Sequence, residues 1–157
     1  MKIFLIITLI VVIMLIAVSV SEQYKDRYDF YFNLKLFLTQ LKLNISFRAD
    51  KLDKFLQQIK PKKNFKIFIA AYQEYLKTTK LDLSQLKILD EDERQELHDI
   101  VTNIGKMDKT NEVKQIEGFV LSIEEKQNQA LQAKTKLCPM IIKLSLLFAL
   151  AVAIVLC

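Results

Sequence analysis

The chain has 157 residues and a net charge of +5, which leaves room for one domain of ordinary size but not for two. It contains 2 glycines and 2 prolines, and this scarcity favours long, rarely interrupted helices over hairpins and bulges. Every Asp and Glu lies between Glu22 and Glu125, while both ends are strongly apolar, so an ordinary soluble globule and a disordered tail are excluded. Cys138 and Cys157, the two cysteines, cannot form a disulfide framework or a C-x-x-C zinc pair.

The amino-terminal segment carries no charge from Ile3 to Ser21. At about 1.5 Å per residue, such a helix covers the roughly 30 Å hydrocarbon core of a bilayer. A cleaved signal peptide is the alternative, with Lys2 as its basic start and Ala17–Ser19 as its cleavage site. Signal peptides have an apolar region of only about 7–15 residues, so the longer run favours an uncleaved transmembrane helix over residues 1–21.

The carboxyl-terminal segment, residues 138–157, predicts a second transmembrane helix if Lys143 extends its side chain to the nearer headgroups. Small residues recur in it at four-residue spacing: Ser145, Ala149 and Ala153. They share one helix face, where they would allow close packing against the first span or against a partner's helix. The alternative is that alanine is simply common in membrane helices.

Basic residues flank the two spans on the side of the central region. They are Lys25, Arg27 and Lys35 after the first span, and Lys126, Lys134 and Lys136 before the second. On the other side of the two spans, toward the chain termini, the only basic side chain is Lys2. The positive-inside tendency therefore predicts a cytoplasmic region over residues 22–137, with both termini across the membrane.

Apolar residues in the central region recur every three or four positions, as in amphipathic helices. The expected buried stripes are Tyr24, Tyr28, Tyr31, Leu34, Leu38, Leu41 and Ile45; Leu52, Phe55, Leu56 and Ile59; Phe65, Phe68, Ile69, Tyr72 and Leu76; Leu83, Leu86 and Leu89; Leu97, Ile100, Val101 and Ile104; and Val113, Ile116, Val120, Ile123 and Ala130. No segment alternates with a period of two. The sequence predicts an all-α membrane protein with an antiparallel helical bundle between two transmembrane helices.

Helix boundaries are indicated by capping residues. Asp50 and Asn64 each suit the start of a helix, and Pro61 ends the short one between them. Asp90 and Glu93 have the spacing of a capping box.

The last helix has signals of the same kind. Gly105 suits the left-handed position after the preceding helix, and Asp108 caps the start of the last one. Pro139 is expected to kink it where it enters the bilayer.

Charge divides the central region. Residues 24–66 carry eleven basic and four acidic side chains, whereas residues 74–125 carry seven basic and thirteen acidic ones. This asymmetry either attracts a charged partner or only reflects solvated helix faces. The densest basic cluster, Lys60, Lys62, Lys63 and Lys66, suggests a weak contact with anionic lipid or an acidic partner. No nucleic-acid motif accompanies it, so no nucleic-acid partner is expected.

The sequence offers little catalytic chemistry. His98 is the single histidine, so it cannot complete a triad or a metal site, and a solvated surface position suits it better. The acidic run from Asp90 to Glu93 spreads around a helix start, where it complements the helix dipole. No phosphate-binding or hydrolase motif is present. We expect no catalytic residue, no metal and no cofactor, and hence no enzyme.

The carboxyl-terminal half shows a resemblance. The stretch from Leu97 to Leu137 resembles stage III sporulation protein AB of endospore-forming bacteria, in which an acidic helix closes with an L-G turn and an aspartate three residues later opens a long helix. The corresponding residues are Ile104, Gly105 and Asp108. The amino-terminal span, the Tyr-Lys-Asp-Arg sequence from Tyr24 and the leucine-rich helix after it are similar too.

The chain departs from that pattern at several positions. Glu112 replaces a glutamine, Ser145 and Ala149 stand where the family tends to have glycine, and Lys143 is unusual within the span.

The resemblance implies a role. The family looks like the helical platform domains of type II secretion and Tad pilus machines, and it belongs to a complex linking mother cell and forespore. The implied partners are a cytoplasmic secretion-type ATPase, other membrane subunits of that complex and the lipid bilayer; a homo-oligomer is compatible with it. The implied location is the mother-cell side of the outer forespore membrane.

Two other interpretations of the sequence remain open. One is a secreted helical surface protein with a cleaved signal peptide and a carboxyl-terminal hydrophobic anchor. The other is an ordinary tail-anchored or bitopic adaptor. An intact Met1 on the mature protein favours the platform, whereas a mature chain beginning near Val20 favours the secreted protein.

Overall fold

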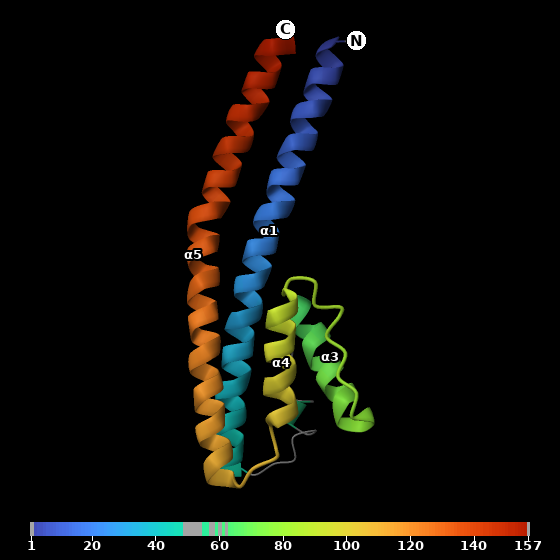
Figure 1. Ribbon diagram of the computed structural model, residues 1–157. Helices are drawn as coiled ribbons and strands as arrows, with labels where there is room; N and C mark the ends of the chain where they lie inside the picture. Colours follow the sequence, from blue (N-terminus) through green and yellow to red (C-terminus); the bar gives the residue numbers. More distant parts are fainter. Residues whose placement is uncertain (1, 49–54, 57–58, 60, 62, 157) are drawn as a thin grey trace. The chain divides into compact units, whose positions relative to one another are not determined.

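The protein is all-α in the part of the chain that the structure, a computed structural model, describes: residues 2–48, 55–56, 59, 61 and 63–156. No strand occurs within these residues, and the helices follow one another along the chain as shown in Figure 1. They are α1 (Lys2–Leu43), a short π-helical stretch η1 (Asn44–Arg48), α3 (Lys63–Thr78), α4 (Glu91–Asn103) and α5 (Lys109–Leu156).

The chain forms two compact units. The first, called the helix pair, comprises residues 1–28 and 128–157. The second, called the central bundle, comprises residues 29–127. Because α1 and α5 are each continuous helices, both of them contribute residues to both units.

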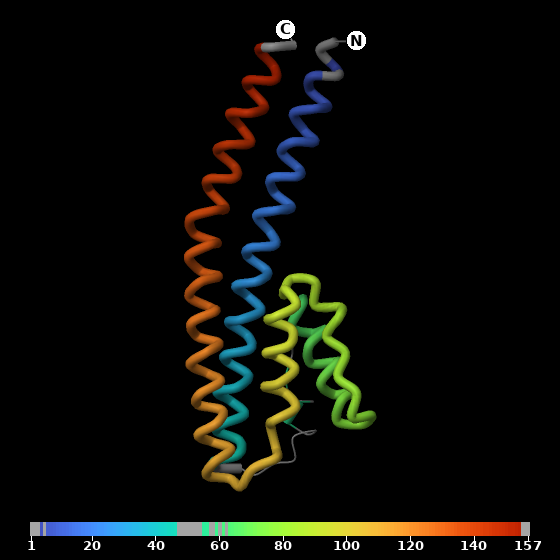
Figure 2. Tube along the Cα trace, in the orientation of Figure 1, coloured from blue at the N-terminus to red at the C-terminus, as the bar shows by residue number. Residues whose placement is uncertain are grey.

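The helix pair consists of the first part of α1 and the last part of α5, which run side by side (Figure 2). Both helices are long and apolar enough to cross a membrane, and an apolar 18-residue segment of each has a mean hydropathy of 2.3 in α1 and 2.4 in α5. Only 11% of each of these segments is buried, so most of the apolar side chains point away from the protein. A soluble core helix would bury them, and this outward-facing surface is what a lipid environment requires.

The core of the central bundle is built on an aromatic cluster between α1 and α3. Phe37 of α1 lies within 6.2 Å, between ring centroids, of Phe65, Phe68 and Tyr72 of α3. Phe30 contacts Phe65 and Phe68 in edge-to-face geometry as well. Such pairs add to the stabilisation that comes from removing apolar area from water.

Most of the expected buried stripes are confirmed. The residues buried as predicted are Tyr31, Leu34, Leu38, Leu41, Leu56, Phe65, Phe68, Ile69, Tyr72, Leu83, Leu86, Leu89, Leu97, Ile100, Val101, Ile116, Ile123 and Ala130. Leu76 was expected to be buried, but 38% of its surface is exposed because it lies in the last turn of α3, beyond the aromatic cluster.

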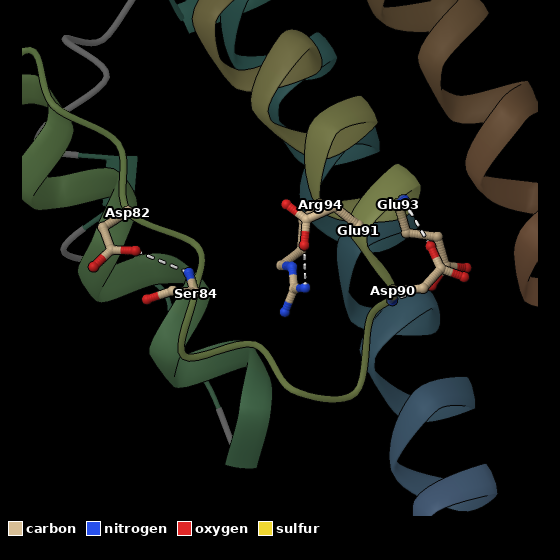
Figure 3. Close-up of polar contacts among 6 residues, drawn as sticks. All are labelled: Asp82, Ser84, Asp90, Glu91, Glu93 and Arg94. Carbon is tan, nitrogen blue, oxygen red and sulfur yellow. Dashed lines mark hydrogen bonds and ion pairs between the residues drawn. The ribbon is translucent and has the colours of Figure 1, made fainter.

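The capping prediction for α4 is confirmed. The carboxylate of Asp90 accepts a hydrogen bond from the backbone N–H of Glu93 at 2.9 Å, and the carboxylate of Glu93 accepts one from the backbone N–H of Asp90 at 3.1 Å (Figure 3). This reciprocal pair satisfies two backbone donors that the first turn of a helix leaves without partners. Just before α4, the Asp82 carboxylate accepts a hydrogen bond from the backbone N–H of Ser84, which shapes the connecting segment.

The turn between α4 and α5 also follows the prediction. Gly105 has a φ of 85°, the left-handed conformation that glycine adopts without a steric penalty, directly after the C-cap residue Ile104. Asp108 precedes α5, and its carboxylate accepts a hydrogen bond from the backbone N–H of Asn111. The helix that follows continues through Pro139 as far as Leu156.

Two expected helix starts differ in outcome. Asn64 was expected to cap α3, but the helix begins one residue earlier, at Lys63, and Asn64 lies inside its first turn. Lys63 itself has a φ of 46°, so the left-handed turn into the helix occurs at this residue. The cap expected at Asp50 lies outside the described residues.

Candidate interaction surfaces

The small-residue stripe on α5 lies in the helix pair. Ala149 is 2% exposed and Ala17, on α1, is 3% exposed, whereas the large apolar residues around both of them are exposed. Ser145 and Ala153 are half-buried, and the Ser145 hydroxyl donates a hydrogen bond to its own helix at the carbonyl of Ile141. Ala149 therefore lies where the two helices approach each other.

A second close approach lies further along the same pair. The Cys138 thiol donates a hydrogen bond to the Ser21 carbonyl at 3.4 Å, and both residues are buried. Near the end of this unit, the Lys134 ammonium lies 4.2 Å from the centroid of the Tyr28 ring, which is a cation–π geometry. Small side chains and these polar contacts thus hold α1 and α5 together without a broad apolar interface.

The buried thiol allows the packing to be tested. Ala149→Leu adds three carbon atoms where α1 leaves no room, so the helices must separate or shift. We expect maleimide to label Cys138 faster in this variant, in full-length protein in detergent with Cys157 replaced by serine. Ala17→Leu should act in the same way from the facing helix.

Ala151→Leu is the matched control, because Ala151 is exposed on the same helix. It should leave the labelling rate of Cys138 unchanged. Equal labelling in all of these variants would show that neither Ala149 nor Ala17 holds the pair together.

The basic cluster is partly described. Lys63 and Lys66 lie exposed in the first turn of α3, and Lys60 and Lys62 fall outside the described residues. The adjacent Phe65 side chain points into the core and is 4% exposed, so this cluster offers charge without an accompanying apolar surface. Cations at a helix N-terminus oppose the helix dipole, and an anionic neighbour would relieve that cost.

The charge asymmetry of the sequence is partly neutralised within the chain. Lys35 of α1 pairs with Glu124 of α5 at 2.6 Å, and Lys42 pairs with Glu117 at 3.4 Å. The carboxylate of Glu96 accepts from Lys126 at 2.7 Å and from the Ser122 hydroxyl at 2.8 Å. Since these side chains keep substantial contact with solvent, each pair contributes about 1 kcal/mol or less to stability.

Glu112 is a buried residue that sequence reasoning did not place in the core. It is 3% exposed, and its carboxylate accepts hydrogen bonds from the backbone N–H groups of Gly105 at 2.7 Å and Met107 at 3.4 Å. A carboxylate in the first turn of a helix is also favoured by the helix dipole. The signal was its position, four residues after the cap Asp108 and one turn before the buried Ile116. Glu112, which stands where the family has a glutamine, therefore has hydrogen-bond partners in the adjacent turn.

Beside Glu112 lies a pocket of about 220 Å³, which is lined mainly by apolar atoms of Leu41, Ile45, Ile104 and Met107. A second pocket, of about 250 Å³, is lined by polar groups that include Arg94 and His98. Arg94 is paired there with Glu91 at 2.6 Å (Figure 3). The His98 side chain is 43% exposed. Among the described residues, no three potential metal ligands converge.

The carboxylate of Asp108, which caps α5, makes the stability of the fold depend on pH. Hydrogen bonds from the side chain and backbone of Asn111 lower the pKa of Asp108 below its ordinary value of 3.8. A carboxyl whose pKa is lower in the folded state stabilises the fold above its unfolded pKa, and that contribution is lost as the pH falls through the folded value.

Asp108→Asn keeps a capping oxygen but removes the titrating group. We therefore expect the urea midpoint of the variant to fall less than that of the unmodified chain between about pH 6 and about pH 3. The measurement is urea denaturation of the full chain in detergent at both pH values. Equal losses on acidification in the two proteins would contradict the role given to this carboxylate.

One comparison with known proteins gives a match. The family model described as "Stage III sporulation protein AB (spore_III_AB)" matches residues 2–157, essentially the whole chain. No curated protein and no solved structure matches the chain.

Proposed function

Because the chain belongs to the stage III sporulation protein AB family, and is therefore a sporulation-related protein, we propose that it is a non-enzymatic platform of a secretion-like complex in the membrane. In this proposal the helix pair, with its two candidate spans, lies in the bilayer, and the central bundle engages a cytoplasmic secretion-type ATPase and other membrane subunits. The observation that carries it is the continuity of α1 and α5, each of which contributes to both units.

That continuity suits a protein that transmits displacement. Backbone hydrogen bonds make a helix stiffer than a flexible linker. We therefore expect a movement imposed on the bundle to be carried along α1 and α5, although Pro139 of α5 lacks the N–H that one of these hydrogen bonds needs. The bundle itself is held by buried aromatic packing and by the Glu93 and Glu112 hydrogen bonds. Closely packed protein interiors are stiff.

The topology follows from charge. Lys25 and Arg27 follow the first span, and Lys134 and Lys136 precede the second, so the central bundle lies in the cytoplasm and both termini lie across the membrane. In the proposed sporulation complex, the bundle lies on the mother-cell side of the outer forespore membrane. The contact of Lys134 with Tyr28 also brings a cation and an aromatic ring to the end of the helix pair, a combination typical of membrane interfaces.

Protease protection of inverted membrane vesicles tests this topology. We expect an added protease to digest residues 22–137 from the exposed cytoplasmic face and to leave two protected apolar fragments. Full protection of the central region would overturn the proposal. A mature chain beginning near Val20 would instead support a secreted surface protein with a carboxyl-terminal anchor.

Partner binding is tested separately. The full-length protein in detergent should retain the purified secretion-type ATPase of the same complex, and retention should weaken as ionic strength rises if Lys63 and Lys66 take part. Lys63→Glu combined with Lys66→Glu should reduce retention, whereas Lys77→Glu, at the other end of α3, is the control. No retention at low salt would remove the ATPase from the proposal.

A further inference from the structure

The central bundle exposes an apolar surface on the outer side of α1 and α5. Phe32, Leu36 and Leu43 of α1 are each 47–49% exposed, and Leu121 of α5 is 67% exposed. Phe32, Leu36 and Leu43 fall on one side of α1, opposite the face that contributes Leu34 and Leu41 to the core. We call the surface made by Phe32, Leu36, Leu43, Gly118 and Leu121 the α1–α5 face.

Two ion pairs place the members of this face beside one another. The Lys35–Glu124 and Lys42–Glu117 pairs join α1 to α5. On α5, Leu121 lies one turn from Glu117 and three residues from Glu124, so these three residues share a side of the helix. On α1, Phe32 lies three residues before Lys35. The exposed apolar residues therefore lie next to the ion pairs that link α1 to α5, on the outer side of the two helices.

Gly118 supports the interpretation of this face as an interface. It lies inside α5, where glycine costs about 1 kcal/mol relative to alanine. A Cβ atom built on it would meet nothing within 4 Å, so no contact inside the chain requires glycine there. A glycine on an exposed helix face has no Cβ and so allows a neighbouring molecule to approach the backbone closely.

We propose that the α1–α5 face binds a second copy of this chain around a two-fold axis parallel to the two helices. Such an axis places α1 of each copy against α5 of the other, so the apolar row of Phe32, Leu36 and Leu43 packs onto Leu121 and the space beside Gly118. A two-fold interface is self-complementary, because each copy supplies both halves of the contact.

The charges on the face favour this partner. Lys35 and Glu124 lie at one level along the helices, and Lys42 and Glu117 lie at another, as their contacts show. Rotation about an axis parallel to the helices keeps these levels, so Lys35 of one copy comes opposite Glu124 of the other, and Lys42 comes opposite Glu117. Each ion pair becomes part of a group of four alternating charges. Glu117 and Glu124 remain 54% and 44% exposed in the single chain, so they are available for the second contact.

The direction of the two-fold axis rests on the proposed function. Two copies inserted in the same membrane with the same topology have their α1 helices pointing the same way, which an axis parallel to the helices preserves. The apolar and charged surface itself is a property of the central bundle alone. Protease protection therefore tests the topology, and the oligomeric state tests this inference.

The first test measures the mass of the full-length protein in detergent by sedimentation equilibrium. We expect a dimer, and we expect Leu36→Glu or Leu121→Glu to weaken dimerisation about tenfold or more, because each buries an extra charge in the contact. Leu76→Glu is the control, because it changes an exposed leucine on α3. A monomeric unmodified protein, or equal dimerisation in all three variants, would overturn the inference.

A second test locates the contact. Two preparations of a cysteine-free chain, one with Leu36→Cys and the other with Leu121→Cys, are mixed and oxidised. We expect the disulfide between the two variants to exceed the disulfide within either preparation, because α1 of one copy faces α5 of the other. Equal cross-linking in every combination, or none, would overturn the two-fold arrangement. Gly118→Leu should lower the yield as well, since it fills the space that the partner needs.

Discussion

Phe68→Ala should be the most damaging single truncation in the central bundle. The Phe68 side chain is 0% exposed, and its ring contacts those of Phe30, Phe37 and Tyr72 at centroid distances of 5.9–6.2 Å. Removing the ring takes its apolar area out of the core and leaves a cavity that the neighbouring rings cannot fill. Phenylalanine truncations of this kind cost about 3–5 kcal/mol, a large share of the stability of a small domain.

The measurement is urea denaturation of the full-length protein in detergent, followed by tyrosine fluorescence because the chain contains no tryptophan. Leu76→Ala provides the control on the same helix, since 38% of Leu76 is exposed. It should cost about 1 kcal/mol or less. Equal losses in the two variants would show that the aromatic cluster does not hold α3 against α1.

Glu93→Ala should have the second largest effect. Its carboxylate accepts a short hydrogen bond of 2.6 Å from the Tyr31 hydroxyl and closes the capping box with the backbone N–H of Asp90. Tyr31 is only 2% exposed, so without Glu93 its hydroxyl loses this buried acceptor. The loss of a buried hydrogen bond to a charged group and of the Glu93 half of the capping box together costs about 2–4 kcal/mol.

Two variants separate these contributions. Glu93→Gln keeps an acceptor oxygen and should recover part of the stability, whereas Asp92→Ala changes an exposed carboxylate in the same turn and should cost about 1 kcal/mol or less. The measurement is again the urea midpoint of the full chain. If Glu93→Ala cost no more than Asp92→Ala, the contact with Tyr31 would have no role in stability.

The helical fold was predictable because local signals agreed with the long-range packing. The capping box at Asp90 and Glu93 and the left-handed Gly105 are recognisable from residue type and spacing, and the structure has both. The family, too, could be recognised from the acidic helix, the turn at Gly105 and the aspartate that opens α5.

Other features depend on which segments meet, which the periodicity of one helix cannot show. Leu76 continues the apolar stripe of α3 but extends past its partners on α1, so it stays exposed. Glu112 reads as a surface residue until the turn at Gly105 brings two backbone donors to it. The opposite charges of the two halves suggested an outside partner or plain solvation, whereas Lys35 and Lys42 partly pair with α5 of the same chain.

The long separation of some contacts has a consequence for how the protein is made. Lys35 and Glu124 lie 89 residues apart in the chain, and Tyr31 and Glu93 lie 62 apart. During synthesis α1 emerges first and α3, its partner in the aromatic cluster, follows, but the contacts of α1 with α4 and α5 must wait until those later helices have been made. Closure of such distant contacts is slow, so a newly made chain passes through a stage in which the bundle is open. A stop codon after Leu137 leaves every residue of the central bundle in the chain, whereas one before Glu112 removes nearly all of α5, so we expect only the first of these chains to close the bundle.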